Sequence, residues 1–382
     1  MKTILPKIKF KKFYEKWNRK KLQSIAPLRG GFAFKSEEFQ DSGIPIVRIS
    51  NIKFDGTVGG EFEYYSKINP DEKFVLRGRS ILLAMSGATT GKIAMLDSEE
   101  EYYQNQRVGY FQNTGAVDYD FLSSVLQTKK FTNQLNSVLV AGAQPNISSK
   151  EIDSFVFYIP ESLEEQSAIG SLFRTLDELL ASYKDNLANY QSLKATMLSK
   201  MFPKAGQTVP EIRLDGFESE WERKNLSEVC TINSGRDYKH LKDGDIPVYG
   251  TGGYMLSVNE KLSDEDAIGI GRKGTIDKPY LLSAPFWTVD TLFYVTCKVD
   301  YDLNYLFLIF QKVRWKKFDE STGVPSLSKK TIEKVVSKFP SLPEQQAIGA
   351  YFSNLDKLIN SHQEKISQLE ILKKKLLQDM FI

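Results

Sequence analysis

A long segment that occurs twice limits what this chain can fold into. Residues 165–202 match residues 344–381 at a constant offset of 179, with 15 of 38 positions identical. Apolar residues recur along both copies at alternating steps of four and three, the spacing of a coiled-coil seam. The predicted seam residues are Ile169, Phe173, Leu176, Leu180, Leu187, Ile348, Phe352, Leu355, Ile359, Ile366 and Leu369. The sequence therefore predicts two equivalent long helices.

Each predicted helix is too long to be buried in a small globular domain, because 38 residues at about 1.5 Å each span about 57 Å. Pairing of the two helices covers both seams; separate packing of each helix on its own domain is the alternative. Lys194 and Lys373 interrupt the seams at the same level, and we expect the adjacent Leu193 and Leu372 to offset the lost apolar contact. His362 also occupies a seam position, where it could weaken the pair locally.

The duplication extends over the whole chain. Residues 6–22 match residues 210–226 at an offset of 204, and VDYD occurs at both 117–120 and 299–302. Because the offset falls from 204 to about 180 along the chain, the first half holds about 24 more residues, all between Leu22 and the first VDYD. The middles of the two halves have diverged. One architecture presenting two specificities explains this pattern, and neutral drift after duplication is the alternative.

The diverged middles read as mixed α/β. We expect strands at 44–49, 80–85, 246–249 and 291–296, and short buried helices at 120–128 and 304–313. The predicted fold class is therefore α+β, with two tandem pseudo-repeated halves, each a mixed α/β domain followed by a long helix. The predicted boundaries are 1–160 for the first domain, 161–203 for the first helix, 204–340 for a linker and the second domain, and 341–382 for the second helix.

The composition argues against several classes of function. No apolar run approaches the roughly 20 residues of a membrane span, and the first residues lack a signal-peptide core, so we expect a cytoplasmic protein with no membrane contact. With two cysteines and two histidines, the chain cannot assemble a zinc cluster. SGATTGK at 86–92 lacks the glycine spacing and the final hydroxyl of a phosphate-binding loop. The sequence predicts a binding protein, without a metal or cofactor of its own, and no enzyme.

Polar residues at and near the glycine-rich turns are candidate DNA contacts. Glycine lets the backbone approach a ligand closely, while cationic and hydroxyl side chains donate to phosphates and base edges. Ordinary turn structure is the alternative for each loop. Nine basic residues lie in 2–21, but the counterpart at 210–225 is acidic, so we expect this arm to add nonspecific affinity at most. The candidates are Arg48, Asn51, Thr89, Thr90, Lys92, Arg107, Gln144, Asn146, Arg236, Tyr238, Lys239, Arg272, Lys273, Thr275 and Ser326.

Three motifs carry a resemblance to a known family: EQSAIG at 165–170, EQQAIG at 344–349 and PEIRLDGFESEW at 210–221. With the tandem halves, they make the full chain resemble the specificity subunit of type I restriction-modification enzymes. The resemblance implies two target recognition domains, each reading one half of a bipartite sequence in double-stranded DNA. It also implies that the two helices pair as an antiparallel coiled coil, which sets the spacing of the half-sites and docks two methyltransferase (modification) subunits.

We assign Glu165, Gln166, Glu344 and Gln345 to this partner surface. The resemblance further places S-adenosylmethionine in the modification subunits, and ATP and magnesium in the restriction subunits. Two alternatives stay open. The chain could serve a different restriction system, whose methyltransferase and nuclease share a chain, or it could be a coiled-coil scaffold with no role in DNA recognition.

Overall fold

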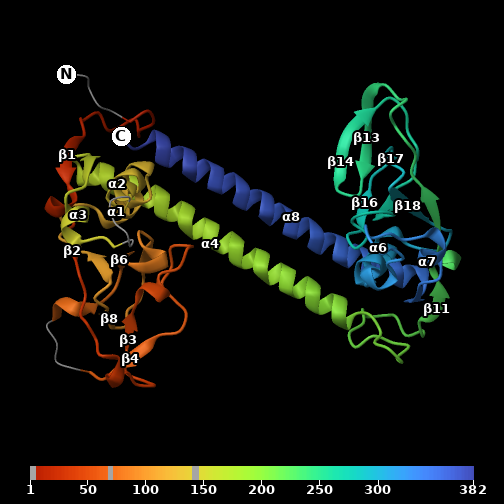
Figure 1. Cartoon of the computed structure of the whole chain (residues 1–382), viewed down its shortest axis with the longest axis horizontal. Coiled ribbons are helices and arrows are strands. Elements are labelled where there is room, and N and C mark those ends of the chain that lie inside the picture. The colour runs from red at the N-terminus through yellow and green to blue at the C-terminus, as the bar shows by residue number, and fades with distance from the viewer. Residues whose placement is uncertain (1–5, 68–71, 140–145) are drawn as a thin grey trace. The chain divides into compact units, whose positions relative to one another are not determined.

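The computed structural model describes residues 6–67, 72–139 and 146–382. The chain divides into two compact units, each of which joins one globular domain to parts of both long helices (Figure 1). The first unit is Met1–Tyr183 with Lys365–Ile382, and the second is Lys184–Glu364.

The first unit contains two four-stranded sheets, ordered β2-β9-β6-β7 and β4-β3-β8-β5, and a two-stranded sheet of β1 and β10. Its strands are β1 Asn18–Lys21, β2 Leu28–Arg29, β3 Ile44–Val47, β4 Glu63–Tyr65, β5 Val75–Leu76, β6 Ser80–Ala84, β7 Ile93–Leu96, β8 Tyr102–Gln104, β9 Val108–Phe111 and β10 Val156–Ile159. Its helices are α1 Tyr119–Leu126, α2 Lys129–Leu139 and α3 Ser149–Asp153, followed by the long helix α4, Leu163–Lys200, which continues into the second unit.

The second unit contains a four-stranded sheet β12-β18-β15-β16, a three-stranded sheet β14-β13-β17 and a two-stranded sheet of β11 and β19. Its strands are β11 Glu222–Asn225, β12 Cys230–Ser234, β13 Asp243–Gly250, β14 Gly253–Val258, β15 Ala267–Gly271, β16 Tyr280–Leu282, β17 Trp287–Thr288, β18 Leu292–Cys297 and β19 Val336–Phe339. Its helices are α5 Leu226–Val229, α6 Leu303–Lys312 and α7 Lys329–Glu333, followed by the long helix α8, Leu342–Asp379.

The two domains repeat one topology, although their middle sequences have diverged. β2-β9-β6-β7 corresponds to β12-β18-β15-β16, and the parallel pair β3 and β8 corresponds to the parallel pair β13 and β17. The strands expected at 44–49, 80–85, 246–249 and 291–296 and the helices expected at 120–128 and 304–313 are all present, within a few residues. The connection between β3 and β4, residues 48–62, is longer than that between β13 and β14, where only 251–252 separate the two strands. The divergence therefore changed loops and left the framework intact.

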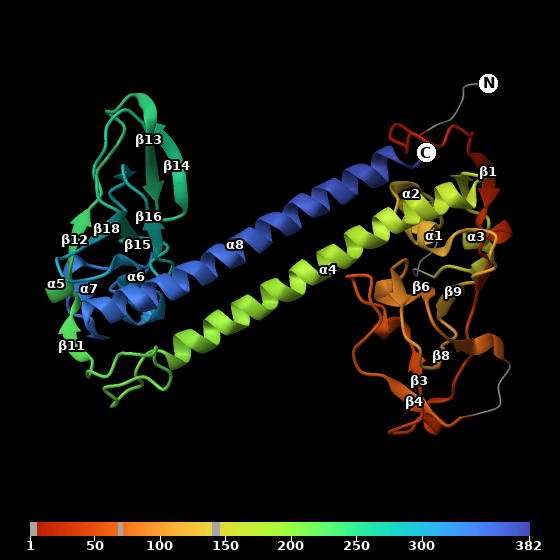
Figure 2. The same ribbon diagram turned by 180° about the vertical axis from the view of Figure 1, so that it is seen from behind.

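The two long helices pair antiparallel. In the first unit the beginning of α4 packs against the end of α8, with Leu176 and Leu180 in one apolar cluster with Leu369. In the second unit the end of α4, at Met197, shares a cluster with Phe352 of α8. Both views of the ribbon show the helices side by side (Figures 1 and 2). Of the predicted seam residues, Leu187 and Ile366 are half-buried and the other nine are buried.

The seam lysines are accommodated by ion pairs, and the leucines expected to compensate for them do not do so. Lys194 Nζ lies 2.6 Å from Asp356 Oδ1, and Lys373 pairs with Asp177 in the equivalent position. Leu193 and Leu372 are exposed, at 37% and 44%. The expectation was wrong because the residue before a seam position faces the flank of a coiled coil, where it cannot fill the gap that a lysine leaves.

The repeated Glu-Gln pair fastens each domain to its long helix. Gln166 accepts from the Asp118 backbone N–H at 2.8 Å and donates to the Pro160 carbonyl at 2.8 Å. Gln345 makes the same two bonds, with Asp302 and Pro340. Since both backbone groups lie in the adjoining domain or at the helix entry, each glutamine holds the helix start in place.

The preceding glutamates are equally internal. Glu165 accepts from the Trp17 indole at 3.2 Å, and Glu344 accepts from the Trp221 indole at 3.3 Å. All four Glu and Gln side chains are at most 2% exposed. Our assignment of Glu165, Gln166, Glu344 and Gln345 to a partner surface is therefore corrected, because buried side chains with internal partners cannot form such a surface in this fold.

The glycine of each AIG motif permits close packing at the same joint. A Cβ on Gly170 would lie 2.5 Å from the Phe121 backbone nitrogen, and a Cβ on Gly349 would lie 2.5 Å from Asp302 Oδ1. Asp118 and Asp302 are also the N-caps of α1 and α6, accepting from the N–H three residues ahead. Asp118 is the first aspartate of its VDYD segment, whereas Asp302 is the second aspartate of the other. The two VDYD segments are therefore not structurally equivalent.

The end of each long helix is anchored in the domain of the opposite half. Phe202, just after α4, lies 5.8 Å from Trp221 and 5.6 Å from Tyr305, measured between ring centroids. Phe381, just after α8, lies 6.1 Å from Trp17 and 5.6 Å from Phe121. These matched aromatic contacts explain why the phenylalanine is retained in both copies.

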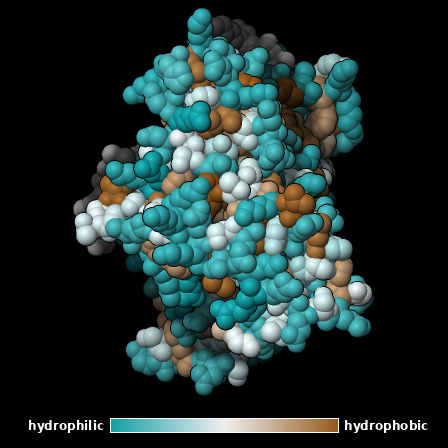
Figure 3. All heavy atoms as spheres, turned by 90° about the vertical axis from the view of Figure 1, so that its right-hand side faces the viewer, coloured by the Kyte–Doolittle hydropathy of each residue, from teal (hydrophilic) through white to brown (hydrophobic). Residues whose placement is uncertain are grey.

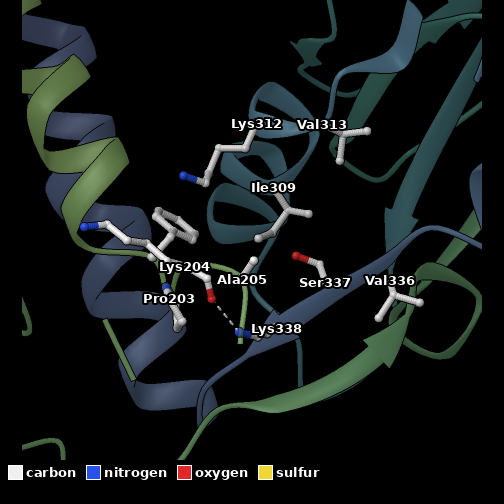
Figure 4. A pocket seen from close by; sticks show the side chains of 10 residues that line it. Pro203, Lys204, Ala205, Ile309, Lys312, Val313, Val336, Ser337 and Lys338 are labelled. Carbon is white, nitrogen blue, oxygen red and sulfur yellow. Dashed lines mark hydrogen bonds between the residues drawn. The ribbon is translucent and has the colours of Figure 1, made fainter. Parts of the chain in front are cut away.

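Lys312 and Lys338 help to line a shallow pocket beside Phe202 (Figure 4). Lys312 extends across it and donates to the Leu198 carbonyl, one of the unsatisfied carbonyls at the end of α4. Lys338 donates to the Lys204 carbonyl at 3.0 Å, the contact dashed in Figure 4. Desolvation lowers the pKa of Lys312. Both lysines thus hold the chain segment that leaves α4.

Candidate DNA interface

In both units the same backbone hydrogen bonds gather three separate segments beside the end of a central strand. In the first unit Met85 N–H donates to the Arg107 carbonyl and Ile147 N–H donates to the Met85 carbonyl, each at 2.9 Å. In the second unit Arg272 N–H donates to the Thr291 carbonyl at 2.8 Å and Leu327 N–H donates to the Arg272 carbonyl at 2.9 Å. We call these arrangements the first junction (residues 85–92, 105–107 and 146–147) and the second junction (residues 271–275, 289–291 and 325–327).

The first junction collects five described candidates from distant parts of the sequence. Isolated β-bridges join Ser86 to Asn146, which brings the turn beside the segment that leads to α3. Thr89 donates through its hydroxyl to the Ile49 carbonyl at 3.3 Å, so the segment after β3 also reaches this place. The candidates there are Thr89, Thr90, Lys92, Arg107 and Asn146, of which Arg107 and Asn146 are exposed. Gln144 lies outside the described residues.

The second junction collects the corresponding candidates. Lys273 and Ser326 form the matching bridge, and Arg272 and Lys273 are exposed. Arg236 approaches from the end of β12, where its N–H donates to the Thr288 carbonyl at 2.8 Å and the preceding Gly235 donates to Leu292. Thr275 and Ser326 are half-buried, and Arg236 and Lys239 are exposed. Tyr238 packs against the small apolar cluster around Val248 and Trp287 instead of standing free.

Local geometry already explains the turn glycines. Gly87, Gly91 and Gly274 have φ of +76°, +87° and +97°, a region that side chains with a Cβ adopt rarely. A Cβ on Gly271 would lie 2.1 Å from the Thr275 carbonyl oxygen. These glycines would be needed without any ligand. SGATTGK also leads into the strand β7, whereas a phosphate-binding loop opens a helix.

Asn51 is removed from the predicted DNA contacts. It is 1% exposed, and its side chain bonds to backbone groups of Arg48, Gly59 and Glu61 at 3.0, 3.3 and 2.8 Å. It therefore holds the loop after β3 together. Arg48 is half-buried, with an ion pair of 3.2 Å to Glu63 that reduces the charge it offers to a ligand.

The structure adds one residue that the sequence reading missed. Phe54 is 90% exposed, and the Lys92 ammonium lies over its ring. Desolvation lowers the pKa of Lys92. The Asp-Gly pair at 55–56 is a common hairpin-turn signal and could have indicated a presented loop here.

Among the described residues, no group of three or more His, Cys, Asp or Glu side chains is placed to hold a metal ion. No helix in the same ranges is long and apolar enough to cross a membrane. On the face drawn in Figure 3, apolar side chains are scattered among hydrophilic ones. The junctions, with their exposed cations and half-buried hydroxyls, can bind phosphates and base edges by hydrogen bonding.

The sequence matches the family model of the type I restriction modification DNA specificity domain twice, over residues 14–189 and 218–371. The chain is 29% identical over 174 residues to the type I restriction enzyme MjaVIII specificity subunit of Methanocaldococcus jannaschii, which covers 44% of this chain and 40% of that protein. It is 22% identical over 406 residues to the putative MjaX specificity subunit of the same organism, covering 95% of this chain and 92% of that one. The first of these alignments thus spans about two fifths of its relative.

A solved structure shares the fold over nearly the whole chain. The crystal structure of the type I restriction-modification system S subunit from M. genitalium superposes with a TM-score of 0.73 at 18% identity, covering 99% of both chains. The two copies of the family domain together cover most of the sequence. The chain belongs to the type I restriction-modification DNA specificity family.

Proposed function

We propose that this chain is the non-catalytic DNA-reading subunit of a type I restriction-modification complex, in which each domain reads one half of a split target. One observation carries the proposal: both units form their junction with the same backbone hydrogen bonds, but the two junctions present different side chains. The first offers Thr89, Lys92 and Arg107, and the second offers Arg236, Arg272 and Lys273. One scaffold with two polar surfaces suits two different half-sites.

The paired helices would set the distance between the half-sites. Each is 38 residues long, or about 57 Å at about 1.5 Å per residue, against about 34 Å for one turn of DNA. A spacer made of equal helices entered at the same motif would have a length that depends on the number of helical turns. The ion pairs Lys194–Asp356 and Lys373–Asp177 support a fixed register between them.

In place of the buried Glu-Gln pairs, we propose that a repeated pair of exposed leucines forms the partner surface. Leu179 and Leu193 of α4 lie two heptads apart and are 43% and 37% exposed; Leu358 and Leu372 of α8 match them at the offset of 179 and are 41% and 44% exposed. We call these four residues the flank leucines. Each unit holds one from each helix, so the chain offers the same apolar pair twice. This duplication fits two copies of one methyltransferase subunit.

Catalysis would belong to those partners. S-adenosylmethionine would bind to the modification subunits, and ATP and magnesium to restriction subunits where these are present. The first experiment is to express the chain with its neighbouring methyltransferase gene and to map methylated bases by long-read sequencing. A single split motif supports the proposal. Methylation that is absent, or unchanged without this chain, contradicts it and favours a scaffold.

A domain exchange would test the division of labour. Replacing residues 23–145 with the segment of another family member should change one half of the methylated motif and leave the other half and the spacing intact. A change in both halves would contradict independent reading.

Replacing Leu179 and Leu372 with aspartate should weaken methyltransferase binding, whereas exchanging exposed Lys184 for alanine, elsewhere on α4, should not.

A further inference from the structure

The segment between β3 and β4 forms a hairpin whose tip is an exposed phenylalanine. Lys53 N–H donates to the Thr57 carbonyl at 2.9 Å, and Gly56 N–H donates to the Lys53 carbonyl at 3.4 Å. Gly56 has φ of +84°, which completes a tight turn followed by a bulge. Phe54 is the first central residue of this turn and is 90% exposed.

The hairpin is held at its base and along one edge, and its own turn is internally hydrogen-bonded. At its base, Ile52 is 1% exposed in the apolar cluster beneath β6, and Asn51 ties both arms through its side chain. On one edge, Met95 N–H donates to the Gly56 carbonyl at 2.9 Å, which fixes the turn to β7. Asp55 accepts from both the N–H and the hydroxyl of Thr57, at 3.0 and 2.6 Å. A large apolar side chain is thus held in solvent by an ordered support.

The neighbours of Phe54 indicate the ligand. Lys92 of the first junction places its ammonium over the Phe54 ring, and Thr89 reaches the same loop through the Ile49 carbonyl. The carboxylate of Asp55, in the same turn, accepts a hydrogen bond from the Thr57 hydroxyl. A flat aromatic side chain beside a cation is the combination that binds a stacked base next to a phosphate. A protein partner would ordinarily meet a broader apolar surface than one ring.

We propose that Phe54 inserts between bases of the half-site read by the first domain, while Lys92 moves from the face of the ring to the adjoining phosphate. This inference rests on the proposed function and extends it to a wedge on the loop between β3 and β4; the two-residue turn 251–252 that joins β13 to β14 carries no aromatic residue. An inserted ring unstacks a base step, so the first half-site should be distorted at the step that Phe54 enters.

The test uses the complex of this chain with its methyltransferase and duplexes carrying the motif found by methylation mapping. 2-Aminopurine, which fluoresces when it is unstacked, replaces one base at a time in either half-site. Wild-type complex should raise the fluorescence at one step of the first half-site. Phe54→Ala should abolish that rise and weaken binding about tenfold, in the range of stacking losses seen for aromatic contacts. Phe54→Leu, which keeps an apolar wedge, should retain part of both effects.

Tyr14→Ala is the matched control. Tyr14 is 75% exposed and has the Lys9 ammonium over its ring, but it lies in the arm before β1, outside the junction. It should leave the fluorescence signal unchanged. Full affinity and an unchanged signal in Phe54→Ala would overturn the wedge while leaving split-site reading intact. Loss of methyltransferase assembly in Phe54→Ala would instead assign the residue to a protein contact. A wild-type complex without any sequence selectivity would overturn the proposed function and the wedge together.

Discussion

The two halves contain the same buried glutamate in two different electrostatic settings, and this gives a sharp prediction about stability. Glu344 is fully buried and takes two hydrogen bonds of 2.8 Å from the Arg213 guanidinium in addition to its tryptophan. Glu165 has its tryptophan, but its second oxygen is buried without a hydrogen-bond partner among the described residues. The position equivalent to Arg213 at the offset of 204 is Lys9.

Glu344→Gln should destabilise the second unit by about 3 kcal/mol, because losing one partner of a buried ion pair leaves the other uncompensated and typically costs about 3–5 kcal/mol. We expect a cost at the lower end of this range because the Arg213 side chain is 16% exposed and also donates to the Ser219 carbonyl. Glu165→Gln should be neutral or should stabilise the first unit by about 1 kcal/mol, because it removes a buried charge that has no cationic hydrogen-bond donor in the described structure.

Hydrogen exchange monitored by mass spectrometry separates the two effects, since the starts of α4 and α8 give different peptides. A loss of about 3 kcal/mol corresponds to about a hundredfold faster exchange around Glu344, with little change around Glu165. The double variant Arg213→Met with Glu344→Gln should recover part of the loss. Equal effects of the two single Glu→Gln changes would refute the electrostatic reasoning and would leave the shared Trp contact as the whole explanation.

Three further outcomes follow from the same contacts. Desolvation raises the pKa of Glu165, so the folded first unit binds a proton more readily than the unfolded chain does. The stability of this unit should therefore fall as pH rises from the ordinary pKa of 4.5 through the raised pKa. Urea titrations at several pH values should show that slope, and Glu165→Gln should remove it. Lys194→Leu should raise thermal stability by about 1 kcal/mol by filling the seam, whereas Asp356→Ala should lower it by about 1 kcal/mol by leaving the lysine unpaired; the opposite order in thermal melts would contradict the seam geometry. Lys92→Glu and Arg272→Glu should each weaken DNA binding and reduce its salt slope by about one, at the first and second half-site respectively; unchanged affinity would remove that residue from the interface.

The sequence was sufficient for the framework because the framework was copied. Two matching seams predicted both helices, and the retained strands around Ile46 and Val248 predicted equivalent sheets. Apolar periodicity depends only on neighbouring residues, so it is visible without coordinates. The pairing of Lys194 with Asp356 is different, because it joins residues 162 apart that no local pattern connects.

The site was harder to predict for the same physical reason. The first junction unites residues from 49, 85–92, 107 and 146, and only the fold shows that they meet. Asn51 looked suited to base recognition, but its amide is used by the backbone of its own loop. Phe54 was overlooked because an isolated phenylalanine is more often part of a core.

The contacts of a residue that both halves retain indicate whether it serves the fold or binding. Glu165 and Gln166 recur as Glu344 and Gln345 because each touches a tryptophan or a backbone group of its own unit, so retention here indicates structure. The flank leucines recur at the same offset, yet they are exposed. Burial cannot have kept an exposed leucine, and helix propensity would be satisfied by any unbranched polar residue. In our proposal, a contact that both halves make with a partner explains the repeat, and the partner surface lies at Leu179, Leu193, Leu358 and Leu372.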